Sequence, residues 1–94
     1  MLNVSDRAKE AMSATERMIA YHLARLEDKD PQVRIRSIEE LALLEATTAY
    51  TALEALYRND PDETVRKAAQ KAGRTLFLKM KEKQEGDGPK PPGK

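Results

Sequence analysis

The only histidine of the chain, His22, is the first side chain to weigh as a catalytic or metal-binding group. It shares a helical face with Met18 and Leu26 in an amphipathic run. A zinc site needs several converging ligands, and the sequence has no second histidine and no cysteine. General-base catalysis needs a partner that orients the imidazole ring, and the sequence identifies none. We therefore interpret His22 as an ordinary packed or half-exposed histidine.

Paired carboxylates are the second kind of chemistry to consider. Glu39 and Glu40 are adjacent, but neighbouring residues of a helix point about 100° apart, so these two side chains do not converge. A solvated helix face explains them, and it also explains Glu10 and Glu16. The sequence has no glycine-rich phosphate loop, nucleophile elbow or zinc-ligand spacing. We therefore predict a protein that is not an enzyme, with no catalytic residues, cofactor, metal or small-molecule substrate.

A basic stripe near the end of the chain is more informative. Lys67, Lys71 and Arg74 recur at helical spacing, and Arg66 adjoins them. Such a stripe is most often a solvated face, but it can also contact an acidic protein surface or the phosphates of a nucleic acid. Only 4% of the residues are aromatic, which counts against recognition of single-stranded nucleic acid by base stacking.

The composition indicates one small globular domain. The chain has 94 residues, of which 39% are hydrophobic and 35% are charged. That balance is too apolar for a chain disordered throughout and too polar for a membrane protein. The first residues lack the basic and apolar regions of a signal peptide. We expect a cytoplasmic protein with no membrane partner.

Helix signals dominate the sequence, and signals for β-strands are almost absent. Ser5-Asp6 is a plausible start for an N-terminal helix of about residues 6–12. Ser13 and Glu16 have the spacing of a capping box, which would open a new helix. One unbroken helix over about residues 6–28 is the alternative, because apolar residues on both sides of Ser13 share a face.

Two Asp-Pro pairs mark the later helix starts. Asp30-Pro31 suits an N-cap followed by proline at the first helical position, and Asp60-Pro61 is expected to repeat this arrangement. Thr47-Thr48 restarts the chain between them. The apolar arc of the helix after Pro31 is wide, which predicts neighbours on two sides. Gly73 costs its helix about 1 kcal/mol relative to alanine and is expected to allow close helix packing.

The chain repeats itself. A shift of 32 residues places Val65-Arg66 on Val33-Arg34 and Asp60 on Asp28. Each unit is then a helix, an acidic turn with proline, and a second helix, and a period in the thirties is typical of an α-solenoid. We predict a helical domain over 1–83, with repeat 1 at about 14–44 and repeat 2 at about 48–82. Residues 84–94, rich in proline, glycine and lysine, are predicted to form a flexible tail.

The two turns, Leu26 to Arg34 and Leu56 to Arg66, resemble those of HEAT-like repeats, including the phycobilisome-lyase type. The likeness covers about residues 14–80 and implies an all-α fold, a short right-handed α-solenoid of about two helix pairs with an N-terminal capping helix. It further implies that Asp28 and Asp60 meet Arg34 and Arg66 in a ladder between repeats, and that Val33 and Val65 enter the core. Pro31 lies two residues before Val33 but Pro61 lies four before Val65, so the two turns cannot be identical.

Two helix pairs leave apolar surface that they cannot bury themselves. Phe77 and Leu78 point away from the apolar stripe of the last helix, and Met80 follows them. We therefore predict a protein interface at Phe77, Leu78 and Met80, or on the second helices of the pairs, with the same chain or a larger complex as partner. The predicted function is an adaptor or accessory subunit. The alternative is binding of nucleic acid or another polyanion through Arg66, Lys67, Lys71 and Arg74.

Overall fold

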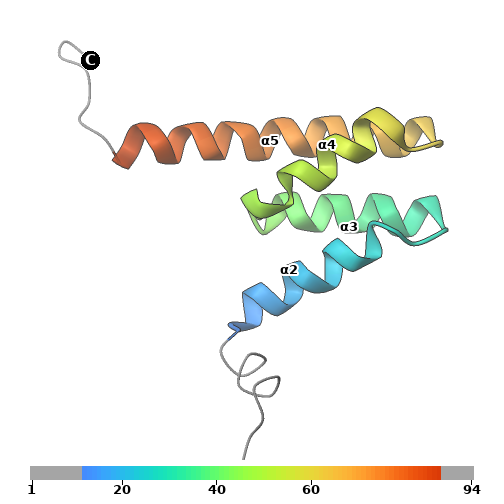
Figure 1. Cartoon of the computed structure of the whole chain (residues 1–94), viewed down its shortest axis with the longest axis horizontal. Helices are drawn as coiled ribbons and strands as arrows, with labels where there is room; N and C mark the ends of the chain where they lie inside the picture. Colours follow the sequence, from blue (N-terminus) through green and yellow to red (C-terminus); the bar gives the residue numbers. More distant parts are fainter. Residues whose placement is uncertain (1–11, 88–94) are drawn as a thin grey trace, which may run out of the picture.

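The computed structural model describes residues 12–87 of the chain, and these residues form two antiparallel helix pairs (Figure 1). Along the chain the elements are α2 (Ala14–Arg25), α3 (Pro31–Leu43), the short 3₁₀ helix η1 (Thr47–Ala49), α4 (Tyr50–Asn59) and α5 (Glu63–Asp87). The first helices of the pairs, α2 and α4, run in one direction, and α3 and α5 run in the other. This part of the chain contains no β-strand, which confirms the all-α prediction. The predicted N-terminal capping helix lies almost wholly outside the described residues.

A reciprocal capping box opens α2. The backbone N–H of Glu16 donates to Ser13 Oγ at 3.0 Å, and the backbone N–H of Ser13 donates to Glu16 Oε1 at 2.9 Å. The backbone hydrogen bond from Ser13 to the carboxylate lowers the pKa of Glu16 from its ordinary 4.5. Because Ser13 is extended, with ψ at 165°, no helix can run through it, and the alternative of one unbroken helix over about 6–28 is wrong.

The two later caps differ from each other. Asp30 accepts a hydrogen bond from the backbone N–H of Gln32 at 2.9 Å, and Pro31 begins α3 as predicted. In the second unit the N–H groups of Thr64 and Val65 both donate to Asp62, at 2.8 and 3.1 Å. Asp60 instead follows the last residue of α4, so the expectation that Asp60-Pro61 would cap the next helix is wrong. The longer turn of the second unit moves the cap two residues along.

The end of α3 is closed by a Schellman motif with glutamate at the position that usually holds glycine. The N–H of Ala46 donates to the carbonyl of Leu41 at 3.0 Å, and the N–H of Glu45 donates to that of Ala42. Glu45 has a φ of 53°, in the left-handed region. Its carboxylate lies 3.2 Å from Lys79 Nζ, and this hydrogen bond raises the pKa of Lys79 above 10.5. The contact links the end of the first pair to α5 at the surface.

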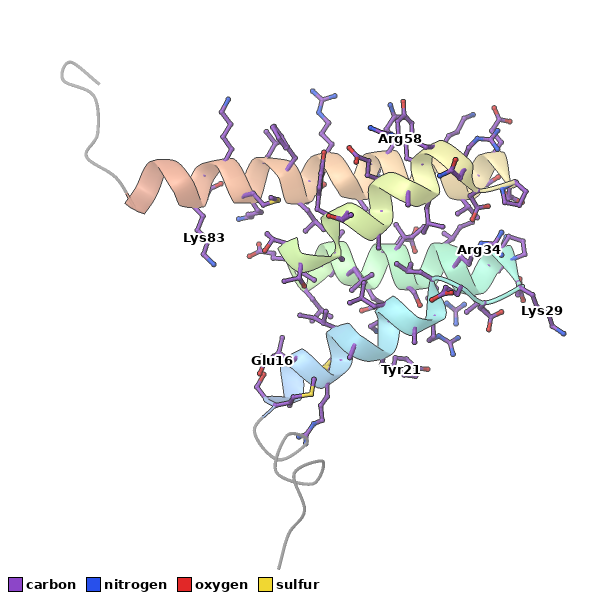
Figure 2. The ribbon with its side chains drawn as sticks, in the orientation of Figure 1. Glu16, Tyr21, Lys29, Arg34, Arg58 and Lys83 are labelled. Atoms are coloured by element: carbon purple, nitrogen blue, oxygen red, sulfur yellow. The ribbon has the colours of Figure 1, made fainter. Side chains whose placement is uncertain are left out.

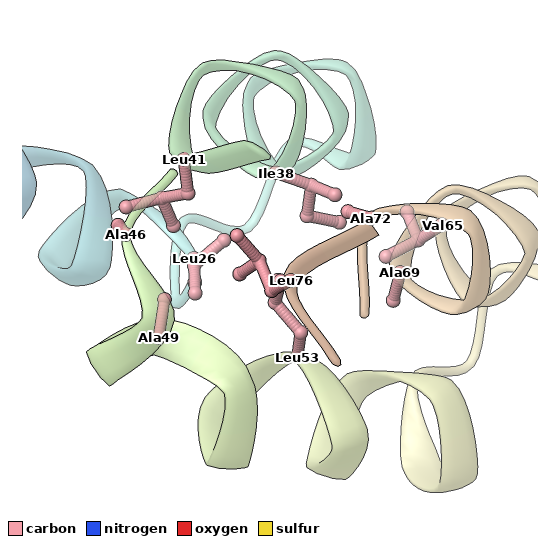
Figure 3. Packing of buried hydrophobic residues seen from close by; sticks show 10 residues of the cluster. All are labelled: Leu26, Ile38, Leu41, Ala46, Ala49, Leu53, Val65, Ala69, Ala72 and Leu76. Atoms are coloured by element: carbon pink, nitrogen blue, oxygen red, sulfur yellow. The ribbon is translucent and has the colours of Figure 1, made fainter. Parts of the chain in front are cut away.

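The apolar core lies between the two helix pairs (Figure 3). Its fully enclosed side chains include Ile38, Leu41, Leu53, Val65 and Leu76, each 0% exposed. Helix α3 packs against α2 on one side and α5 on the other, as its wide apolar arc predicts. The two valines implied by the resemblance differ, because Val33 is only half-buried.

Helix α5 is longer than predicted and reaches Asp87. The prediction that the helix would end before Gln84 is therefore wrong, because a run of good helix formers continues it: Lys81, Glu82, Lys83, Gln84 and Glu85. Residues 88–94 of the predicted tail lie outside the described part of the chain. Between residues 12 and 87, the helices all fall short of the length and apolar character that crossing a membrane requires.

Candidate interaction groove

Arg34 links the two helix pairs through a buried, two-point ion pair. Its Nε donates to Asp60 Oδ2 at 2.8 Å, and its Nη2 donates to Asp60 Oδ1 at 3.0 Å. Its Nη1 donates to the backbone carbonyl of Asp28, in its own turn, at 2.7 Å. Figure 2 shows Arg34 at the corner end of α3, where the turns of both units meet. The guanidinium of Arg34 therefore joins the first helix pair to the second.

Arg66 occupies the equivalent place in the second unit. Its Nη1 donates to the backbone carbonyl of Asp60 at 2.7 Å, which copies the bond between Arg34 and Asp28. Among the side chains that the structure describes, no carboxylate pairs with Arg66. In the ladder between repeats, Arg34 is paired with a carboxylate, and we call this position the closed rung. Arg66 has no such pair among the described side chains, and we call its position the open rung.

The helix faces that follow these two arginines have different side chains. In α3, Arg34 is followed by Ile38 and Leu41, which are both buried beneath the second helix pair. The shift of 32 residues places Gln70 and Gly73 of α5 on these two positions. The outer face of the second unit is therefore more polar and less filled than the equivalent face of the first.

A groove of about 290 Å³ lies between α4 and α5 on this outer face. Three of its lining residues are aromatic, and the centroids of the Tyr50 and Phe77 rings lie 6.2 Å apart. Phe77 is 49% exposed and Tyr57 is 45% exposed. The lining residues are Tyr50, Glu54, Tyr57, Ala69, Gln70, Gly73, Arg74 and Phe77.

Gly73 leaves this groove open. A Cβ placed on Gly73 would meet no atom within 4 Å outside its own stretch of helix. The expectation that Gly73 allows close packing of two helices is therefore wrong for the described residues. The glycine costs helix stability and relieves no contact within the domain, so it preserves a hollow in the surface.

The predicted apolar interface residues are not on one surface. Phe77 lines the groove between α4 and α5, whereas Leu78 is 55% exposed and is not among the groove residues. Met80 is half-buried. Sequence analysis did not identify the two groove tyrosines, Tyr50 and Tyr57. The repeat alignment did contain a signal for the groove, since Gln70 and Gly73 stand where the first unit has Ile38 and Leu41.

The basic stripe is also divided by the structure. Arg74 lines the α4–α5 groove, and Lys71 lines a second groove between α3 and α5. Lys67 Nζ lies 3.8 Å from Glu63, and Arg66 is bonded to the turn. The second groove has a volume of about 440 Å³, and Leu43, 77% exposed, borders it. Sequence analysis did not single out Leu43.

His22 has a structural partner. Its Nδ1 lies 3.3 Å from Ser37 Oγ, and Ser37 is only 1% exposed. A hydroxyl buried to this extent cannot meet a substrate, so the pair does not form a usable nucleophile and base. The contact instead ties α2 to α3 and gives a buried hydroxyl its hydrogen bond.

Comparison with known proteins agrees with this architecture. A family model described as HEAT repeats matches residues 9–73, which is more than half of the chain. The match is to HEAT repeats in general and does not single out the phycobilisome-lyase type. No curated protein and no solved structure matches the chain.

Proposed function

The chain belongs to the HEAT-repeat family, and on that basis we propose that it is a non-enzymatic protein-interaction module. It acts as an adaptor or accessory subunit in the cytoplasm and receives its partner in the groove between α4 and α5. Stacked helix pairs suit this role because they present continuous surfaces to a partner. Fold alone does not determine function, so the proposal depends on the character of the groove.

The observation that carries the proposal is the glycine at the base of an aromatic groove. Phe77 and Tyr57 leave about half of their surfaces in water, and aromatic side chains of this kind dominate the binding energy of protein interfaces. Gly73 keeps open a space that leucine fills at the equivalent position of the first unit. A partner side chain that enters this space would lie among the three aromatic side chains that line the groove.

Binding of a polyanion through the basic stripe is less well supported. A phosphate-binding surface needs several cations directed to one side of the molecule, but Lys67 lies 3.8 Å from Glu63. Lys71 and Arg74 border different grooves. Binding that weakens steeply with rising salt would favour the polyanion over the apolar groove.

Photo-crosslinking from two positions tests which groove receives a partner. A photoreactive phenylalanine analogue is placed at Phe77 in one protein and at Leu43 in the other, and both are irradiated in lysate of the source cells. We expect one defined adduct from position 77 that is absent from position 43. The same adduct from position 43 alone would place the interface on the second helices, α3 and α5. No adduct from position 77, or an adduct with nucleic acid that no longer forms when salt is added before irradiation, would contradict the proposal.

A further inference from the structure

We propose that Arg66 is the carboxylate-binding end of the α4–α5 groove and that the partner is a helical segment with an acidic residue near its N-terminus. The carboxylate binds Nε and Nη2 of Arg66, and an apolar side chain of the same segment enters the hollow at Gly73. This inference rests on the proposed function and adds the chemistry of the partner to it.

The bonds of Arg34 at the closed rung show how a carboxylate would bind Arg66 at the open rung. Arg34 and Arg66 each use Nη1 to hold a backbone carbonyl six residues earlier, both at 2.7 Å. With Nη1 held in this way, Arg34 presents Nε and Nη2 to both carboxylate oxygens of Asp60. The Nε and Nη2 atoms of Arg66 have no hydrogen-bond partner among the side chains and backbone of residues 12–83. Arg66 is half-buried and already oriented, so a carboxylate would meet a prearranged two-point donor.

The position of Arg66 on the helix places this donor in line with the hollow. Arg66 and Gly73 are seven residues apart, which is about two turns or about 10 Å along one face of α5. In the junction between the units, Asp60 precedes α5, and the apolar residues of α5 then cover Ile38 and Leu41. A segment that fills the outer groove in the same way carries its acidic residue first and its apolar side chain about two to three turns later.

Charge identifies an acidic segment as the occupant. Arg74 lines the groove, and Glu54, the one acid among the described residues that line it, lies 3.5 Å from Arg58. Residues 88–94 contain Lys90 and Lys94 and no acidic side chain, so this segment has the wrong charge to occupy the groove.

A second copy of the chain, stacked as a third unit, is also a poor fit. By the shift of 32 residues, Arg17 of the second copy would take the position that Ala49 has in the internal junction. Arg58 of the first copy would take the position that Leu26 has there. In the internal junction both of these positions are in the core, so two arginines would be buried together.

Two synthetic helical peptides test the inference on the full chain. Both are capped, rich in alanine and glutamine, and carry leucine about two and three turns after the first residue. They differ only in that first residue, which is Asp in one and Asn in the other. Nuclear magnetic resonance follows the amide of Gly73 and the Nε–Hε group of Arg66, with the Nε–Hε group of Arg34 as an internal reference.

We expect the Asp peptide to bind about tenfold more tightly than the Asn peptide, as a charge-assisted two-point bond implies. The Arg66 Nε–Hε signal should move toward that of Arg34. Arg66→Lys, which keeps the charge but loses the planar fork, should remove the preference, whereas Arg74→Gln should retain it. Thermal unfolding establishes that both variants are folded.

Three other results of the peptide experiment would contradict either the role of Arg66 or the groove itself. Equal affinity of the two peptides, with Gly73 perturbed by both, overturns the role of Arg66 and leaves the groove as the interface. A preference for Asp that persists in Arg66→Lys also overturns that role. If neither peptide perturbs Gly73, the groove itself, and with it the proposed function, is contradicted.

Discussion

Arg34 and Asp60 form a buried ion pair across the two repeats, with donor–acceptor distances of 2.8 and 3.0 Å. Their side chains are only 11% and 3% exposed. The pair does more than join two surfaces, because Asp60 Oδ1 also accepts the backbone N–H of Asp62 at 2.9 Å and so shapes the second turn. The ion pair therefore joins the two units and also holds the second turn in shape.

Arg34→Ala should lower the free energy of unfolding by about 3–5 kcal/mol, because it leaves a buried carboxylate without its partner. Urea denaturation followed by circular dichroism measures the loss. Arg66→Ala is the matched control and should cost about 1 kcal/mol, since it removes one hydrogen bond at a half-buried site. Equal losses in the two variants would contradict the distinction between the closed and open rungs.

Gly73→Ala should raise the free energy of unfolding by up to about 1 kcal/mol, because alanine favours the helix and its Cβ enters open space. Thermal and urea unfolding of the free chain measure this gain. A loss of stability would show that something already occupies the space beside Gly73, and light scattering would reveal whether a second copy does so.

Leu53→Ala should destabilise the protein by about 2–5 kcal/mol, because Leu53 is fully enclosed between the pairs. Leu43→Ala should change the free energy of unfolding by less than about 0.5 kcal/mol, since Leu43 is 77% exposed. Parallel urea titrations make the comparison. Similar losses in both variants would show that the surface at Leu43 is covered in the free protein.

The capping box of α2 should weaken in acid. The pKa of Glu16 is lowered in the folded chain, so the carboxylate stabilises the fold at pH values above 4.5. This contribution is lost as the pH falls from 4.5 through the lower pKa of the folded state. Ser13→Ala removes the side-chain hydrogen bond but keeps the backbone N–H donor, so it should return the pKa of Glu16 only part of the way to 4.5 and cost about 1 kcal/mol. Titration of the Glu16 carboxyl carbon by nuclear magnetic resonance provides the measurement, and a pKa at or above 4.5 in the unsubstituted chain would contradict the assignment.

Much of the fold was predictable because it is encoded locally and twice. The capping box at Ser13, the Asp30-Pro31 start and the 32-residue repeat each depend on nearby residues, and together they predicted the two helix pairs. The cap of α5 was not predicted correctly, because Asp60 and Asp62 are both suitable caps by type. Asp60 is instead held by Arg34 from the other unit, a contact between distant residues.

The candidate site was predictable only in part. Phe77 was identified from its position away from the apolar stripe, but a helical pattern cannot show that Tyr50 of the preceding helix lies beside it. Leu78 is just as exposed as the pattern predicted and yet does not line the groove. The comparison of Leu41 with Gly73 would have located the hollow, because it shows where the second unit lacks a side chain that the first unit buries.

The affinity of Gly73→Leu for the protein captured at Phe77 tests the central claim most directly. Leucine at this position restores the side chain that the first unit has at Leu41 and fills the groove without adding charge. Isothermal titration calorimetry on the folded variants should show binding reduced by about tenfold or more in Gly73→Leu and unchanged in Leu43→Ser. Full affinity in Gly73→Leu, or a loss confined to Leu43→Ser, would show that the groove between α4 and α5 is not the binding site.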